Sequence, residues 1–270
     1  METKYQPVGK CIYCGTSDKQ LTDEHTIAFG LNGAFVLPKA SCDDCAKITG
    51  RTEGQVLRGF ALDARTALGF QTRRPKNVPK TFRLGVIRGG QEEIIDVPIG
   101  DHAVVLPLPL YPEPAYFQEQ KGDHSYGGGI GLSGIVTVWV SDREQVRKKF
   151  NADEIFIEQI VDHISFAKML AKIGFCQAVA QFGRDAMEEG YVLPAILGAR
   201  DDIGKWVGSS GHVLSPAPGV GHQIYAEKLH RPGPMREETL IVAYIRLFSR
   251  VASPMYLVIV GGTKGAVRVN

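Results

Sequence analysis

Four cysteines near the N-terminus form two Cys-x-x-Cys pairs, Cys11 with Cys14 and Cys42 with Cys45. Two intervening residues allow both sulfurs of a pair to point at one centre, as a tetrahedral Zn²⁺ site requires. Gly15 follows the first pair and favours the tight turn that a zinc-binding knuckle needs. The spacing therefore predicts one structural zinc ion held by all four cysteines rather than disulfides.

The 27 residues between the two pairs contain a second group that could do chemistry, Asp23-Glu24-His25. Histidine usually titrates near neutral pH and suits general-base catalysis, while a carboxylate suits a hard cation. In an extended strand Glu24 and His25 point to opposite faces, so a bulge or turn must bring both to one centre. Residues 30–33 contain the turn formers Gly, Asn and Gly, and 34–37 is predicted as a second short strand.

The predicted order is knuckle, strand, turn, strand, knuckle and helix, and in this order the chain resembles the HNH (His-Asn-His, ββα-metal) endonucleases stapled by a four-cysteine zinc. The resemblance covers residues 8–70 and lies in CIYCG (11–15), LTDEHTI (21–27), the turn at 30–33 and SCDDC (41–45). It implies that His25 is the general base that activates water against a DNA phosphodiester. It also implies that Glu24, or else Asp23, helps to hold one divalent cation, Mg²⁺ or Mn²⁺, at the scissile phosphate.

The chain departs from the family directly after the second cysteine pair. The family has His or Asn at that position, whereas this chain has Ala46, which cannot bind a metal. Glu53 lies seven positions further on the same helical face and could replace the missing ligand, about 10 Å along the helix. Alternatively, the module has lost the cation and only binds nucleic acid. A zinc-stabilised protein–protein adaptor is a third alternative, and it predicts no salt-sensitive DNA binding.

Basic residues are concentrated towards the N-terminus. Residues 1–83 contain thirteen Lys and Arg against eight Asp and Glu, whereas 84–270 contain eighteen against twenty-one. Helical features extend over 43–69, and their spacing places four basic side chains on one face: Lys47, Arg51, Arg58 and Arg65. Residues 71–83 form a predicted extended basic arm or linker that contains Arg73 and Arg74. We expect these six side chains to neutralise phosphates, and a solvated helix face with an ordinary linker is the alternative.

The remaining two-thirds of the chain predict an α+β domain with an antiparallel sheet and one long helix. Strands are expected at 82–87 and 92–99, which form a hairpin, and at 134–140, 222–229, 239–248 and 255–262. A long helix is expected at 152–182 and a shorter one within 194–207. Cys176 is expected to be a small buried hydrophobe.

The predicted organisation is a zinc-stapled HNH-like module at 1–70, a basic linker at 71–83 and an α+β domain of unknown role at 84–270. No catalytic constellation is recognisable in that last domain, which could bind a ligand or mediate homo-oligomerisation. The hydrophobic fraction is 44% and the charged fraction 22%, values typical of a globular protein. No apolar run suits a membrane span or a signal peptide, so a cytoplasmic location and no membrane partner are expected.

Overall fold

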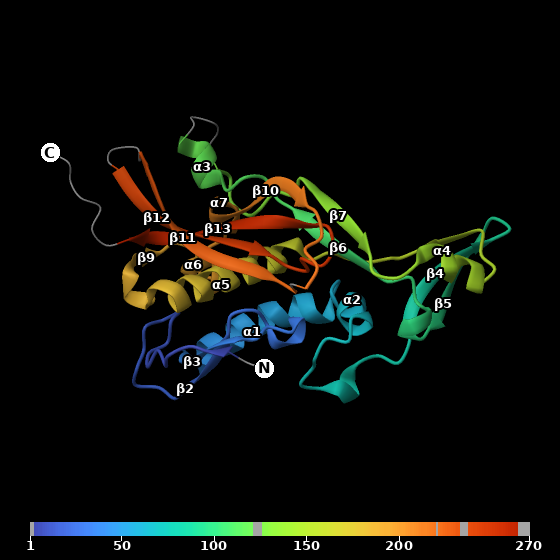
Figure 1. Ribbon diagram of the computed structural model, residues 1–270, viewed down its shortest axis with the longest axis horizontal. Helices are drawn as coiled ribbons and strands as arrows, with labels where there is room; N and C mark the ends of the chain where they lie inside the picture. The colour runs from blue at the N-terminus through green and yellow to red at the C-terminus, as the bar shows by residue number, and fades with distance from the viewer. Residues whose placement is uncertain (1–2, 121–125, 220, 233–236, 264–270) are drawn as a thin grey trace.

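The computed structural model describes residues 3–120, 126–219, 221–232 and 237–263. It has a mixed α+β architecture with antiparallel sheets and one long helix, as the sequence predicts. Three layers are visible in Figure 1: a small N-terminal unit at the bottom, the long helix α5 (His163–Phe182) in the middle, and a large sheet above it. A smaller unit with β4 (Phe82–Arg88) and β5 (Gln91–Val97) extends to one end of the molecule.

The N-terminal unit is a short sheet that leads directly into a helix. β2 (Leu21–His25) pairs antiparallel with β3 (Phe35–Cys42), and β1 (Thr3–Lys4) pairs parallel with β3 on its other edge. The turn between β2 and β3 contains the 3-10 helix η1 (Phe29–Leu31). A Cβ at Gly33 would lie 1.9 Å from the carbonyl oxygen of Ile27, so this turn requires glycine. β3 continues into α1 (Asp43–Arg58), which gives the predicted order of strand, turn, strand and helix.

The helical segment predicted at 43–69 is broken into two helices. α1 ends at Arg58, and α2 (Leu62–Ala67) begins after a short turn. The break is at Gly59, which leaves the helical conformation with φ −94° and ψ −131°. Only glycine fits this backbone conformation, because a Cβ there would lie 2.5 Å from the carbonyl oxygen of Gln55. The prediction that Arg65 shares a helical face with Lys47, Arg51 and Arg58 is therefore wrong, since Arg65 belongs to α2.

The long helix α5 is apolar on all sides, which is typical of a helix buried within a core. The sequence predicted helix from residue 152, but α5 begins only at His163, because the preceding segment forms β8 (Glu154–Phe156) and pairs with β4. Asp162 caps α5, since its Oδ1 accepts a hydrogen bond of 2.9 Å from the backbone N–H of Ser165. None of the helices in the described ranges combines the length and apolar character that crossing a membrane requires.

The large sheet has the strand order β10–β13–β12–β11, and β9 pairs with the end of β13. Its pairings are antiparallel, and its strands are β9 (Met187–Gly190), β10 (Val207–Leu214), β11 (Gln223–Pro232), β12 (Glu237–Arg246) and β13 (Ser253–Thr263). The strands predicted at 222–229, 239–248 and 255–262 are confirmed as the last three of these.

The other elements complete the two ends of the molecule. β6 (Val105–Leu110) and β7 (Gly134–Trp139) form a two-stranded sheet, and the predicted hairpin of β4 and β5 is confirmed, with β8 on the other edge of β4. The remaining helices are α3 (Ala115–Gln120), α4 (Arg143–Lys149), α6 (Leu193–Ile196) and α7 (Ile203–Trp206). The last two stand where the sequence predicted one short helix.

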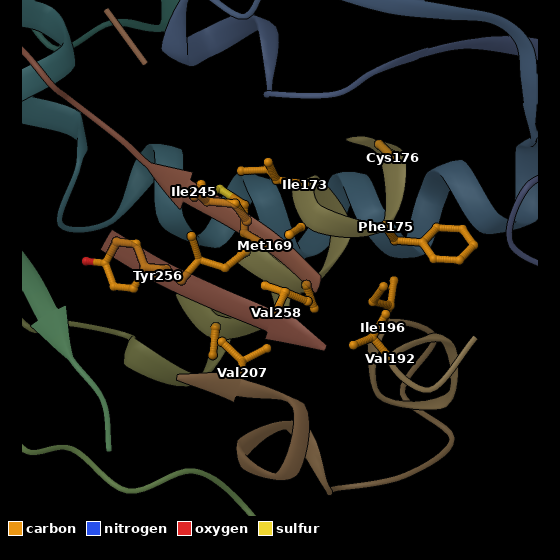
Figure 2. Packing of buried hydrophobic residues seen from close by; sticks show 14 of the residues in the cluster. Met169, Ile173, Phe175, Cys176, Val192, Ile196, Val207, Ile245, Tyr256 and Val258 are labelled. Atoms are coloured by element: carbon orange, nitrogen blue, oxygen red, sulfur yellow. The ribbon is translucent and has the colours of Figure 1, made fainter. Parts of the chain in front are cut away.

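One continuous hydrophobic core joins the N-terminal unit to the large sheet through α5. The rings of Tyr13 and Phe175 stack with their centroids 5.9 Å apart, which links the first cysteine loop to α5. On the opposite side of α5, Figure 2 shows Met169 in one cluster with Tyr256 and Val258 of β13. Cys176 is fully buried in this core, as predicted.

Candidate metal cluster and nucleic-acid groove

The four cysteines that were predicted to bind zinc lie together. Their ligand atoms are all within 4.8 Å of one another, and Cys14 Sγ lies 3.7 Å from Cys42 Sγ. Sulfurs at the usual Zn–S distance around one tetrahedral ion would be about 3.8 Å apart, whereas a disulfide would bring two sulfurs to about 2.0 Å. All four thiols are free. The cluster could therefore hold a metal ion such as zinc.

Local backbone structure places these sulfurs. In the first pair, the N–H of Gly15 donates to the carbonyl oxygen of Cys11 at 2.8 Å, and Gly15 adopts a φ of +79° that favours glycine. In the second pair, Cys42 ends β3 and Cys45 lies in the first turn of α1. Burial raises the pKa of the Cys11 thiol, but hydrogen bonds from backbone N–H groups, first that of Cys14, outweigh it and lower the pKa to about 7. The cluster thus favours thiolate at one of its members before any metal is considered.

A groove of about 570 Å³ lies on the N-terminal unit, next to the end of β2. Its walls come from β2, the η1 turn, one face of α1, the start of α2 and the arm at 72–78. It gathers the histidine and all the carboxylates that the sequence proposed for catalysis: Asp23, Glu24, His25 and Glu53. Ala46, at the position where the resemblance expects a ligand, also lines the groove.

Glu24 and His25 both contribute to the groove although they are neighbours on one strand. The register between β2 and β3 shifts between Thr22 and Glu24, but Glu24 and His25 themselves pair in regular register with Leu37 and Val36. The irregularity therefore lies before both residues, and it does not turn their side chains to one face of the strand. Glu24 is buried, whereas His25 is half-buried and has its ring edge-on to Phe29, with centroids 5.8 Å apart. Asp23 is exposed and forms an ion pair of 3.3 Å with Lys4.

A buried lysine from α5 joins the two glutamates. Lys172 Nζ lies 2.7 Å from Glu24 Oε1 and 2.9 Å from Glu53 Oε1, and its side chain is only 2% exposed. The same ammonium donates to the backbone oxygen of His25 and lies 3.5 Å from that of Thr26. Two carboxylates from β2 and α1 therefore converge on one point, and that point is occupied by a positive charge from another part of the chain.

Burial and the neighbouring charges have opposite effects on the pKa values of Glu53 and Lys172. Burial raises the pKa of the Glu53 carboxyl above its ordinary value, and Lys172 opposes that shift. Burial alone would lower the pKa of Lys172, but the attraction of Glu24 and Glu53 outweighs it, so the pKa is raised. The ammonium is accordingly protonated at neutral pH, and it lies at ion-pair distance from both carboxyl groups.

Sequence reasoning missed Lys172, although the chain carries a signal for it. Lys172 lies in the middle of a helix that is apolar all round, where a lysine is rarely buried without a paired anion. That pattern indicates a buried carboxylate partner. It does not say which one, because Glu24 and Glu53 lie far away in the sequence.

The structure places the six predicted phosphate-binding residues in three different settings. Arg58, Arg73 and Arg74 are exposed and line the groove, and the Arg73 guanidinium lies over the Phe29 ring, 5.4 Å from its centroid. Lys47 and Arg51 are exposed on α1 outside the groove lining.

Arg65 lines the groove but is buried, and it holds the groove together. Its Nε donates to the carbonyl oxygen of Gly30 at 2.8 Å, and its Nη2 donates to that of Gln71 at 3.0 Å. Asn32 adds a parallel link, since its Oδ1 accepts from the N–H of Gln71 at 2.9 Å. The η1 turn and the basic arm are thereby fixed to one another through α2.

The groove-bearing unit is also linked to the C-terminal part of the chain by a half-buried histidine, His222. The backbone N–H of Phe248 donates to His222 Nδ1 at 3.1 Å, so Nε2 carries the proton and donates to the carbonyl oxygen of Leu31 at 2.7 Å. Burial lowers the pKa of His222, which favours this neutral form. The position of the η1 turn therefore depends on the C-terminal part of the chain.

Comparisons of the chain with protein-family models, with curated proteins and with solved structures find no match.

Proposed function

We propose that this chain is an HNH-type nuclease that binds the phosphodiester backbone of nucleic acid, with DNA as the first candidate, in the groove beside β2. The observation that supports this proposal is that His25, the acidic cluster and three exposed arginines line a single groove. A half-buried imidazole beside guanidinium groups suits an anionic substrate that must be attacked by water. Zinc bound by the four cysteines would act as a structural staple that fixes β3 against α1.

In the proposed reaction His25 removes a proton from water, and the resulting hydroxide attacks the phosphorus atom. The bond from phosphorus to one bridging oxygen breaks, and that oxygen takes up a proton. The products are one phosphomonoester and one free hydroxyl. Arg58, Arg73 and Arg74 neutralise charge on the phosphates, and Arg73 also stacks over Phe29 at the entrance.

The resemblance to HNH enzymes also implies a divalent cation, Mg²⁺ or Mn²⁺, at Glu24, with Glu53 as the replacement ligand. These residues do not fit such an ion in the arrangement described, because the point on which both carboxylates converge is taken by Lys172 Nζ. No step of the proposed hydrolysis is therefore assigned to a cation held by this pair.

A second candidate function is nucleic-acid binding without cleavage. Two observations favour it: Ala46 lines the groove in place of a metal-binding side chain, and Lys172 fills the carboxylate pair. The arginines would then hold the backbone of the nucleic acid, and the reactive positions around His25 would serve only to shape the groove.

Cleavage assays with matched histidine variants separate these functions. Zinc-loaded wild type, His25→Ala and His212→Ala are incubated with supercoiled plasmid and with labelled single-stranded DNA, double-stranded DNA and RNA, each with and without added Mg²⁺ or Mn²⁺. His212 is the control because it is an exposed histidine on β10. Binding is measured in parallel over a range of salt concentrations.

The nuclease proposal expects wild type and His212→Ala to cut at least one substrate, while His25→Ala still binds but does not cut. Salt-sensitive binding by all three proteins without cleavage would support the second candidate instead. If zinc-loaded wild type neither binds nor cuts any of these nucleic acids, both functions are wrong.

A further inference from the structure

We infer that Lys172 is a built-in counter-ion that takes the place of the divalent cation at the Glu24–Glu53 pair, so the native groove does not bind Mg²⁺ or Mn²⁺ there. Removal of the lysine should turn the same carboxylates into a divalent-cation site. This inference rests on the proposed function only because it assumes that the groove is the functional site. It can be tested without any cleavage reaction.

The surroundings of the ammonium are those of a hard-cation site. Among the described residues, four oxygens lie within 3.5 Å of Lys172 Nζ: one carboxylate oxygen each from Glu24 and Glu53, and the backbone oxygens of His25 and Thr26. The Cys176 thiol, one turn later on α5, also acts on the charge of Lys172. Carboxylate and carbonyl oxygens are also what Mg²⁺, Mn²⁺ and Ca²⁺ take as ligands. The ammonium of Lys172 therefore occupies a position that is surrounded by oxygens suited to a divalent cation.

Charge balance explains why the lysine and a divalent cation exclude each other. Glu24 is buried and the Glu53 side chain is 17% exposed, so the attraction of both for a cation is only weakly screened by solvent. A divalent ion entering this position would meet a monovalent ammonium at ion-pair distance from the same oxygens. The carboxylates could bind that ion only if the ammonium left.

Movement of the ammonium out of this position is opposed by the packing of α5. The residues on either side of Lys172, Ala171 and Ile173, are fully buried, and the helix lies between α1 and the large sheet. Lys172 also borders a small crevice lined by Thr49, Thr52, Glu53 and Lys168, but a displaced ammonium there would lose its ion pair with the buried Glu24 and would lie closer to the positive charge of Lys168, which is unfavourable. The packing of α5 therefore keeps the ammonium of Lys172 between Glu24 and Glu53.

Lys168 provides a matched control on the same helix. It lies one turn before Lys172, it is half-buried, and it borders a small crevice that also contains Glu53, Thr49 and Thr52. Its removal changes the net charge by the same amount as removal of Lys172. Only the latter vacates the point between the two glutamates.

The test is a titration of zinc-loaded wild type, Lys172→Met and Lys168→Met with Mn²⁺, followed by the electron paramagnetic resonance signal of free Mn²⁺. Mn²⁺ does not compete with Zn²⁺ for a thiolate site, so the cysteine cluster should not interfere. We expect Lys172→Met to bind one equivalent of Mn²⁺ that wild type does not bind, because the positive charge between the two glutamates has been removed. Lys168→Met should behave like wild type, and adding Glu24→Gln to Lys172→Met should abolish the new site.

A direct result on the native chain could overturn this inference even if Lys172→Met does not fold. Wild type and Glu24→Gln are compared in the same titration. Uptake of Mn²⁺ by wild type that Glu24→Gln removes would show that the cation displaces the lysine. Equal, negligible uptake by both would support the built-in counter-ion. A folded Lys172→Met protein that binds no additional Mn²⁺ would also contradict the inference. None of these measurements uses nucleic acid. Failure of this inference can therefore be distinguished from failure of the nuclease proposal.

Discussion

The four-cysteine cluster and the Glu24–Lys172–Glu53 cluster both gather groups of like charge, but the chain builds them in opposite ways. The cysteines come from two tight loops within the N-terminal unit, and a metal ion from solution would supply the positive charge between them. The glutamates come from β2 and α1, and a lysine of α5 places one positive charge between them. A centre built from local loops can be recognised in a sequence, whereas a centre closed by a distant helix depends on how the two parts of the chain pack.

The largest expected effect tests whether the cysteine cluster is a structural metal centre. Cys42→Ser should lose zinc and unfold the N-terminal unit, because structural zinc contributes about 10 kcal/mol or more to such folds. The loss should extend to the rest of the chain, since the hydrophobic core is shared. Zinc content by mass spectrometry and thermal unfolding by circular dichroism measure the two effects. Cys176→Ala is the control and should retain zinc; normal zinc content and stability in Cys42→Ser would show that the cluster is not a metal centre.

The second effect concerns the lysine-closed cluster. Lys172→Met should lower the free energy of unfolding at neutral pH by about 3–5 kcal/mol in the absence of divalent cations, because two carboxylates are left without compensation. The triple variant Lys172→Met/Glu24→Gln/Glu53→Gln should regain most of this loss. Urea unfolding measures both. A single variant as stable as wild type would mean that the ion cluster contributes nothing to the packing of α5 against the N-terminal unit.

A third and smaller effect distinguishes two arginines that line the groove, the exposed Arg73 and the buried Arg65. Arg73→Gln should weaken nucleic-acid binding and reduce the salt dependence by about one charge, with stability unchanged to within about 0.5 kcal/mol. Arg65→Gln should instead destabilise the chain by about 1–3 kcal/mol, because the carbonyl oxygens of Gly30 and Gln71 lose a charged donor. Fluorescence anisotropy over a salt series measures binding. Arg143→Gln, an exposed arginine on α4, is the control, and an equal loss of affinity in it would argue against the groove as the binding site.

The smallest effect is a pH dependence at the junction of the two parts. Burial lowers the pKa of His222 below its ordinary value of 6.5, so the unfolded chain takes up a proton that the folded chain does not. The stability contributed by neutral His222 is present above pH 6.5 and is lost as pH falls from that value towards the lowered pKa. Urea unfolding at several values between about pH 5 and 8 should show this loss in wild type and a weaker slope in His222→Gln. Identical slopes would mean that His222 does not control the junction.

Much of the fold was predictable because its signals are local. Period-two alternation identified β4, β5 and the three C-terminal strands, and an apolar run identified the body of α5. The predicted helix began too early because the apolar residues of 152–162 continue the spacing of the helix that follows. Only pairing with β4 makes part of this segment a strand. The break at Gly59 was missed because glycine is tolerated within helices, and only the three-dimensional structure shows that Gly59 adopts a non-helical backbone conformation.

For the candidate site, the sequence by itself determined the cysteine cluster and the neighbourhood of Glu24 and His25, since residue spacing within a short loop limits where side chains can meet. Glu53 followed from helical periodicity, which places it on the groove face of α1 with Ala46. Only the tertiary structure decided that Arg65 holds backbone carbonyls, that the arm lies beside the groove, and that Lys172 fills the carboxylate pair. These features arise from contacts between segments far apart in the chain, and a burial requirement in a sequence identifies that a partner must exist but not which residue supplies it.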